Sequence, residues 1–217
     1  MPHLVASTSW GLAVALIVLA YLLGSFSGSL LLGRLRGVDI RTLGSGNAGG
    51  TNALRTQGWR FALGTVLIDI GKGALATWLA WQWMPDAARG WGEYAAALAA
   101  VAGHVWPLFH GFRGGKGAAT LVGALAVAWP AALPVILAVW LLSLLSTGYV
   151  GLSTVLAAIS LPLFAMASGA GAIRIVFALA AAALLVYTHR ANLARLRAGT
   201  ESRFERVRVL RRRKARR

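Results

Sequence analysis

Three short segments of this chain combine glycine with hydroxyl, amide and cationic side chains, whereas the sequence around them is almost continuously apolar. They are residues 44–52 (GSGNAGGTN), 114–117 (GGKG) and 189–201, which begins with His-Arg-Ala-Asn. Inward-facing backbone N–H groups, neutral donors and cations are the groups that bind phosphate oxygens in proteins. Such residues are costly near a bilayer unless they serve a function. The three segments therefore indicate one phosphate pocket, if they lie on one face of a membrane.

The segment 44–52 holds four glycines, which allow the backbone to turn several N–H groups inward. Arg55 follows it, and a guanidinium matches phosphate oxygens in bidentate fashion. A flexible loop is the alternative, but such a loop would tolerate Lys, Glu or Pro, and the segment contains none. We interpret Ser45 as a hydrogen-bond donor, because no carboxylate–histidine relay is visible that would activate it as a nucleophile. The other residues expected to contact substrate here are Asn47, Gly49, Thr51 and Asn52.

The segment 114–117 invites comparison with the phosphate loop of nucleotide-binding proteins, but the spacing fails. His110 stands where that loop requires its first glycine, and Gly117 stands where it requires Ser or Thr. What remains is Lys116 held between glycines, suited to a point-charge contact with phosphate beside Gly114 and Gly115. A juxtamembrane lysine that pairs with lipid is the open alternative.

The third segment spaces His189, Asn192 and Arg195 three residues apart, so a helix that continues out of the membrane would carry them on one face. A neutral imidazole at that boundary can act as a base or as a hydrogen-bond donor. An ordinary interfacial histidine is the alternative. We place His104, which precedes a proline on an apolar stretch, in that ordinary class.

Composition excludes several classes of chemistry. The chain has no cysteine and only six acidic residues, and no Asp, Glu or His cluster has metal-ligand spacing, so we expect no metal and no cofactor. Asp69 and Lys72 lie three apart within an apolar stretch. An ion pair inside a membrane indicates a functional role, and the alternative is a structural pair whose charges neutralise each other. The net charge of +16 reflects membrane edges and anionic lipid rather than nucleic acid.

The elements that must position these residues are membrane helices, because 58% of the 217 residues are hydrophobic and 13% are charged, against about 25% charged in soluble domains. We predict an all-α integral membrane protein. The expected spans are about 10–33, 59–84, 92–109, 149–167 and 172–188, with either one or two helices in 117–147. Pro130 and Pro134 favour a hairpin within 117–147, since proline breaks a helix.

The charge distribution supports the hairpin. With it, nineteen basic residues fall on one side and two, Arg89 and Arg174, on the other, while Lys72 lies within a span. Without it, the twelve C-terminal cations would move to the outer side, against the positive-inside rule. We therefore predict seven transmembrane helices, some of them short, with the N-terminus outside and the C-terminus cytoplasmic. All three polar segments then lie on the cytoplasmic face.

The motifs together resemble the bacterial acyl-phosphate:glycerol-3-phosphate acyltransferase family (PlsY). The resemblance begins at Gly24-Ser25 and covers most of the chain. It continues through Asp39-Ile40-Arg41, residues 44–47, Thr51-Asn52, Arg55, Gly103-His104, Pro107, Phe112, residues 114–120 and the pattern from His189 to Glu201. Ser27, Gly50 and residues 148–151 depart from the family pattern.

The resemblance implies a bacterial inner-membrane enzyme that transfers an acyl group from acyl phosphate to the sn-1 hydroxyl of glycerol 3-phosphate. The products are lysophosphatidic acid and phosphate, as phospholipid biosynthesis requires. The implied active-site residues are Ser45, Arg55, Lys116, His189 and Asn192. Thr154, Arg195 and Glu201 complete the substrate-binding set, with Thr154 where the family usually has serine.

The base is either His189 or a phosphate oxygen of the donor. We expect a monomer with one membrane domain, residues 1–202, and a basic cytoplasmic tail, 203–217, that contacts anionic lipid. A membrane transporter of a phosphorylated solute is the alternative function, although its polar groups would lie near the membrane midplane between repeated halves.

Overall fold

The computed structural model describes residues 2–205, with side chains from Ser9 onward, and this range folds into helices without strands. The α-helices are α1 (Pro2–Gly24), α2 (Gly28–Leu35), α3 (Gly50–Gln57), α4 (Trp59–Trp83), α5 (Trp91–Val105), α6 (Ala118–Ala128), α7 (Leu133–Thr147), α8 (Val150–Ala167), α9 (Ala172–Thr188) and α10 (Arg190–Arg197). Short 3-10 turns are η1 (Ile40–Thr42), η2 (Asp86–Ala88), η3 (Leu108–His110) and η4 (Pro130–Ala132).

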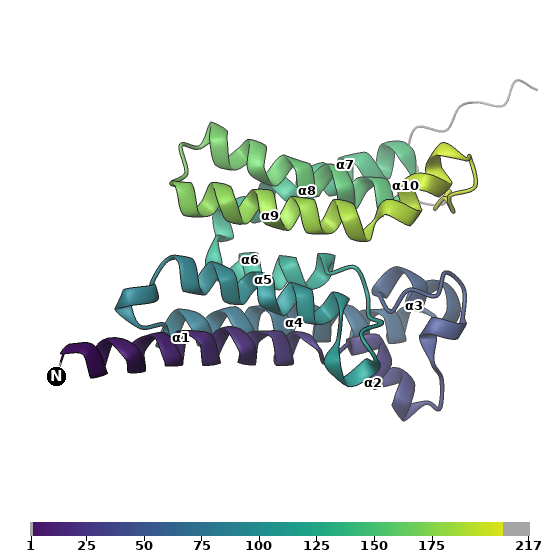
Figure 1. Ribbon diagram of the computed structural model, residues 1–217. Helices are drawn as coiled ribbons and strands as arrows, with labels where there is room; N and C mark the ends of the chain where they lie inside the picture. The colour runs from purple at the N-terminus through teal and green to yellow at the C-terminus, as the bar shows by residue number, and fades with distance from the viewer. Residues whose placement is uncertain (1, 206–217) are drawn as a thin grey trace, which may run out of the picture.

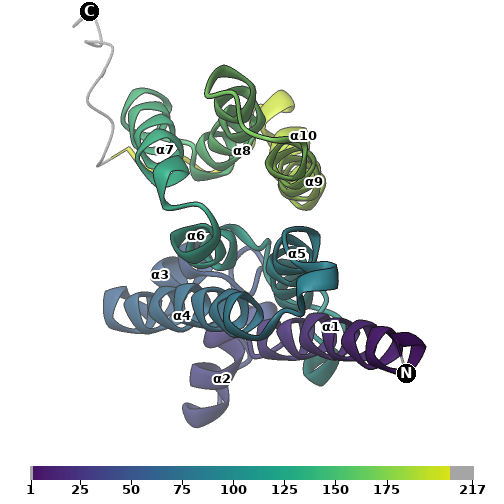
Figure 2. The ribbon, with the colours of Figure 1, turned by 90° about the vertical axis from the view of Figure 1, so that its left-hand side faces the viewer.

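The helices form two groups that lie one above the other (Figures 1 and 2). The first group contains α1 to α6, and the second contains α7 to α10. The connection between α6 and α7 joins the groups, and α5 packs against α9 where the rings of Tyr94 and Phe177 approach to 4.8 Å. Most long helices run along one common direction, so each group has two ends.

Glycines allow the helices of the first group to approach closely. Gly24 of α1 and Gly103 of α5 each face the backbone of the other helix, and a Cβ at either position would collide with a carbonyl. Gly73 of α4 and Gly123 of α6 form a second seam of the same kind. Small residues allow such close packing where apolar surface alone does not drive helices together.

The predicted helix break near Pro130 is confirmed, whereas the hairpin as two membrane crossings stays a prediction. Helix α6 ends at Ala128 and α7 begins at Leu133, with η4 between them. Trp129 leaves the helical conformation with φ −157° and ψ 70°, directly before Pro130. The proline thus acts as expected on the preceding residue, which it disfavours in the α region.

The predicted first span is broken. Helix α1 ends at Gly24, α2 begins at Gly28, and the two axes are bent by 47°. The break frees backbone groups, and two charged residues of α4 satisfy them. Gly28 N–H donates to Asp69 at 3.0 Å, and the Phe26 carbonyl accepts from Lys72 at 3.0 Å. Helix breaks persist in apolar surroundings where neighbouring helices supply such partners.

By length and composition, three segments can cross a membrane: α4, residues 130–147 and α8. The number rises to five if the bent pairs α1–α2 and α9–α10 each count as one span. Helices α5 and α6 have 15 and 11 residues and are shorter than a full span. Seven crossings and their orientation stay a prediction.

Candidate active site

Residues of the second and third polar segments meet at one end of the helix groups, beside α10 (Figure 1). The Lys116 ammonium donates a hydrogen bond to Oδ1 of Asn192. The hydroxyl of Thr188, the last residue of α9, donates to the Lys116 carbonyl oxygen at 3.0 Å. Helix α10 turns away from α9 by 54°, which aims Asn192 toward the lysine loop. The structure therefore joins segments 114–117 and 189–201.

Glu201 fixes the residues of α10. Its Oε1 accepts from Asn192 Nδ2 at 2.6 Å, and its Oε2 accepts from Arg195 Nε at 2.7 Å. Asn192 also packs on α8, because a Cβ at Gly151 would lie 2.8 Å from its side chain. The Oδ1 of Asn192 accepts a hydrogen bond from Lys116 and its Nδ2 donates one to Glu201, so the amide is held in one orientation.

His189 occupies the junction of α9 and α10 and is 5% exposed. Its Nδ1 lies 2.8 Å from the Leu185 carbonyl, which can only accept, so we assign the proton to Nδ1. In the neutral ring this leaves Nε2 with a free lone pair. That tautomer suits an acceptor of a proton or of a hydrogen bond.

The charge balance around Lys116 is positive. Burial, and then the nearby Arg195, lower the pKa of Lys116 to about 8; Glu201 opposes the shift, and Arg55 adds to it. Arg55 is therefore close enough to act on Lys116 although it comes from α3. Three cations and one carboxylate converge, so an anion that enters would relieve their repulsion.

The first polar segment is organised by Asn52, which is 1% exposed. Its amide donates to the carbonyls of Ile40 and Leu43 at 3.1 and 2.9 Å, and its Oδ1 accepts from the Ser45 N–H at 3.0 Å. These bonds engage both ends of the Asn52 amide within the loop. The Ser45 side chain itself is exposed at the same end of the molecule.

Arg41 links the first segment to the second. Its guanidinium donates to the carbonyls of His110 and Arg113 at 2.8 and 3.2 Å, while Asp39 pairs with it at 2.8 Å. The Ala48 carbonyl also lies against Gly115, where a Cβ would approach it to 2.7 Å. Sequence reasoning gave Arg41 no such role, since its partners lie about seventy residues away.

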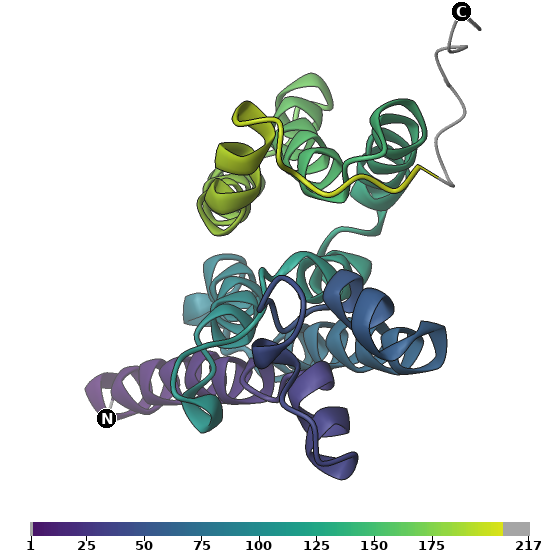
Figure 3. The same cartoon turned by 90° about the vertical axis from the view of Figure 1, so that its right-hand side faces the viewer.

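Phe204 contacts the candidate site from beyond the expected end of the membrane domain. The Arg55 guanidinium lies over its ring at 4.8 Å, and the Phe204 N–H donates to the Gly148 carbonyl at 2.9 Å. The segment after α10 crosses this end of the molecule toward α7 (Figure 3). Sequence reasoning missed Phe204, because nothing in the local pattern shows that the chain turns back.

A polar pocket of ≈ 220 Å³ opens at the lysine loop. Its lining includes Asn47, Val105, Trp106, Phe112, Arg113, Gly114, Gly115, Lys116, Tyr187, Thr188 and Arg190. The three polar segments each contribute to this end of the molecule, and Asn47, Gly114, Gly115 and Lys116 are the expected substrate residues that line the pocket itself.

Three further expected residues, Gly49, Thr51 and Thr154, are not among the residues that line this pocket. Gly49 precedes α3, and its N–H donates to the Asn47 carbonyl at 2.9 Å, while Thr51 is half-buried in the first turn of α3. Thr154 lies on α8, three residues beyond Gly151. Its hydroxyl donates to the Val150 carbonyl at 2.9 Å and accepts from Trp140 Nε1 at 3.3 Å.

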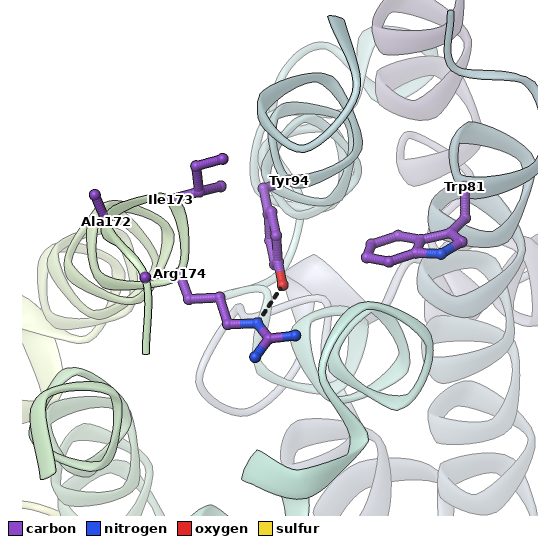
Figure 4. Close-up of a pocket in the computed structure, with 6 residues that line it drawn as sticks. Trp81, Tyr94, Ala172, Ile173 and Arg174 are labelled. Carbon is purple, nitrogen blue, oxygen red and sulfur yellow. Dashed lines mark hydrogen bonds between the residues drawn. The ribbon is translucent and has the colours of Figure 1, made fainter. Parts of the chain in front are cut away.

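A larger pocket, of ≈ 320 Å³, lies at the opposite end of the helices and is mainly apolar (Figure 4). Trp81, Tyr94 and Arg174 line it, and Arg174 Nε donates to the Tyr94 hydroxyl at 3.0 Å. It contains no residue of the three polar segments. The donors and cations that a phosphate needs gather at the polar pocket.

The fold and this pocket define a class: an all-α protein of apolar helices with a cationic, glycine-rich pocket at one end. Comparison with known proteins agrees. The family model described as glycerol-3-phosphate acyltransferase matches residues 14–199. The chain belongs to this family, the PlsY family of glycerol-3-phosphate acyltransferases, and it is an acyltransferase.

Individual relatives are similar over nearly the whole chain. A glycerol-3-phosphate acyltransferase of Synechococcus sp. (strain CC9902) is 42% identical over 194 residues, which cover 88% of this chain and 95% of the relative. That of Bordetella pertussis is 45% identical over 198 residues, covering 88% and 91%. The crystal structure of PlsY (YgiH), an integral membrane glycerol 3-phosphate acyltransferase, in its glycerol 3-phosphate form has TM-score 0.83 and 36% identity, covering 88% of this chain and 95% of that one.

Proposed function

We propose that this protein transfers a fatty acyl group from acyl phosphate to the sn-1 hydroxyl of glycerol 3-phosphate, releasing lysophosphatidic acid and inorganic phosphate. One observation carries the proposal: Arg55 and Arg195 lie near enough to Lys116 to lower its pKa, and Lys116 lines a pocket together with Gly114 and Gly115. Both substrates carry phosphate, and the cations offset the repulsion that separates them. Glycerol 3-phosphate is also the ligand of the similar PlsY crystal form.

The residues have different roles in binding the substrates, according to where they lie. Lys116 and the N–H groups beside it bind phosphate oxygens, and Arg55 supplies a planar pair of donors from α3. Asn192, held by Glu201, keeps the lysine aimed at the pocket. Ser45, Asn47 and Thr51 offer neutral donors from the first loop. Acyl phosphate is already activated, so holding the two substrates together supplies much of the barrier reduction.

The reaction needs an acceptor for the proton of the attacking hydroxyl. The hydroxyl oxygen forms a bond to the acyl carbon, the bond from that carbon to the phosphate oxygen breaks, and phosphate leaves. His189 Nε2 can receive the proton, since Nδ1 is engaged with Leu185. A phosphate oxygen of the donor is the competing acceptor. Neither route requires a metal or a cofactor.

The proposal includes a membrane arrangement. Seven crossings place the N-terminus outside and the polar pocket on the cytoplasmic side of a bacterial inner membrane, where glycerol 3-phosphate is dissolved. The acyl chain stays among the apolar helices. The protein acts as a monomer, and the basic residues 206–217, which lie outside the described range, contact anionic lipid.

The deciding experiment supplies purified protein with acyl phosphate and glycerol 3-phosphate and measures lysophosphatidic acid and phosphate in equal amounts. Acyl-CoA replaces acyl phosphate in a parallel reaction and should give no product. Turnover with acyl-CoA alone would overturn the donor assignment while leaving the acyltransferase class intact. The transporter alternative receives no support from the pocket, which lies at one end of the helices and not at their midpoint.

A further inference from the structure

A second polar cluster lies inside the first helix group, away from the pocket. Asp69 and Lys72 of α4 and His104 of α5 are 1%, 7% and 3% exposed. The expected pairing of Asp69 with Lys72 is confirmed, with Nζ and Oδ1 2.9 Å apart. His104 differs from the expected interfacial residue, because it is buried beside the pair. A buried ionic cluster costs desolvation energy and is weak evidence for stability by itself.

Lys72 uses its three ammonium protons on three acceptors. They are Asp69 Oδ1 at 2.9 Å, the Phe26 carbonyl at 3.0 Å and His104 Nδ1 at 2.8 Å. Asp69 Oδ1 also lies 3.3 Å from His104 Nδ1, but the Lys72 ammonium is closer and can only donate hydrogen bonds. His104 Nδ1 is therefore an acceptor, and in the neutral ring the proton lies on Nε2.

The other side of the His104 ring faces the lysine loop. A Cβ at Gly115 would collide with His104 Nε2, so the ring fills the space that a side chain would need. The N–H of Gly115 donates to the His104 carbonyl at 3.1 Å, and the N–H of Gly114 donates to Val105 at 3.1 Å. His104 thus contacts, through both its ring and its backbone, the residues directly before Lys116.

We propose that Asp69, Lys72 and His104 form a positioning network that sets the conformation of the Gly114–Gly115–Lys116 loop for phosphate binding. Lys72 fixes the orientation of the His104 ring, and the ring supports Gly115 where the Ala48 carbonyl also meets it. None of the three residues lines the polar pocket. They act through the loop on the affinity for glycerol 3-phosphate, and the proposal rests on the proposed function of that loop.

The test uses a double variant, Asp69→Asn with Lys72→Met, which removes both charges together. An asparagine can still accept from the Gly28 N–H, and methionine occupies similar volume, so no single charge is left buried. We expect the purified variant to fold, with Kd and KM for glycerol 3-phosphate raised about tenfold and KM for the acyl donor within about twofold of wild type. Kd is read without any donor, as glycerol 3-phosphate-induced thermal stabilisation.

Two further variants separate positioning from stability. Thr77 also lies on α4, and its buried hydroxyl has no hydrogen-bond partner within the described residues. Thr77→Val removes that hydroxyl and should leave Kd and KM for glycerol 3-phosphate unchanged. His104→Asn keeps an acceptor near Nδ1 for Lys72 but removes the ring edge beside Gly115. It should melt near the wild-type temperature and still lose about tenfold in affinity for glycerol 3-phosphate.

Wild-type values of Kd for glycerol 3-phosphate in both folded network variants would overturn the positioning role. A loss of affinity in Thr77→Val equal to theirs would overturn it as well. The proposed function is tested separately by the unmodified protein. If wild type shows no stabilisation by glycerol 3-phosphate, the proposed function fails, whatever the variants do.

Discussion

Lys116 donates a hydrogen bond to Asn192, a residue 76 positions later in the chain. This contact connects the glycine-rich loop before α6 with helix α10, and so joins the two groups of helices at their polar end (Figure 1). It has a direct consequence for chemistry. The Lys116 ammonium is held by the neutral amide oxygen of Asn192. An incoming phosphate therefore displaces an uncharged hydrogen-bond acceptor and not a carboxylate.

Replacing Lys116 by methionine, or Arg55 by alanine, should raise KM for a phosphorylated substrate while the protein still folds. A lost charge-assisted contact costs about 1.5–3 kcal/mol, or roughly 10- to 150-fold in kcat/KM. Steady-state kinetics on protein that elutes as a single species in detergent measures the effect. Arg60→Ala, which removes a cation over Trp59 just past α3, is the matched control. Unchanged kinetics in a folded variant would remove that residue from the site.

The pH profile should report the ionisation of Lys116. Its pKa is lowered to about 8, so the free enzyme loses this charge as pH rises through about 8, well below the ordinary range of lysine. We expect kcat/KM for glycerol 3-phosphate to fall on that alkaline side. Lys116→Arg keeps its charge throughout this range, so the fall should disappear or move to higher pH. A profile that is the same in both proteins would contradict the assignment.

Glu201→Gln should weaken catalysis and shift the same profile. The amide oxygen can still accept from Asn192, but Arg195 loses its ion pair. Because Glu201 raises the pKa of Lys116, its neutralisation should move the alkaline fall to lower pH and reduce kcat/KM about tenfold. Glu205→Gln removes the same charge from an exposed position and serves as the control. Identical profiles for the two variants would exclude a local effect of Glu201.

Phe204→Ala should raise KM a few-fold by releasing the Arg55 guanidinium. A cation–π contact at an exposed site contributes about 0.5–1 kcal/mol, or roughly two- to fivefold. Arg203→Ala, which removes a cation over Tyr149, should leave KM unchanged.

Ending the chain after Leu210 retains Phe204 and should weaken binding to anionic vesicles while turnover in neutral detergent stays the same. Loss of turnover there would give the tail a part in the active site.

Topology can be read with reporter fusions. A reporter placed after Arg197 and one placed within residues 34–43 should both be cytoplasmic, because these regions lie at the same end of the helices and carry most of the basic residues. A reporter at the N-terminus should be on the outer side. Fusions after Arg197 and within 34–43 on opposite sides would refute the seven-crossing arrangement.

The sequence by itself determined the helical class, most helix boundaries and the three polar segments. These features are local: hydropathy over a window marks α4, α8 and α9, and Pro130 ends α6. Glycine, amide and cation content within a few residues marks the loops. Membership of the family follows from the same local motifs in order along the chain.

Only the tertiary structure decided which of these groups touch. The break after Gly24 depends on Asp69 and Lys72 of another helix, and His104 is buried because α5 packs against that helix and against the loop at Gly115. Phe204 reaches Arg55 because the chain turns back after α10. A residue's own neighbours set its helical preference, but its partner is set by how helices distant in sequence pack. For that physical reason the pattern showed the components of the pocket, and the fold alone showed what holds them in place.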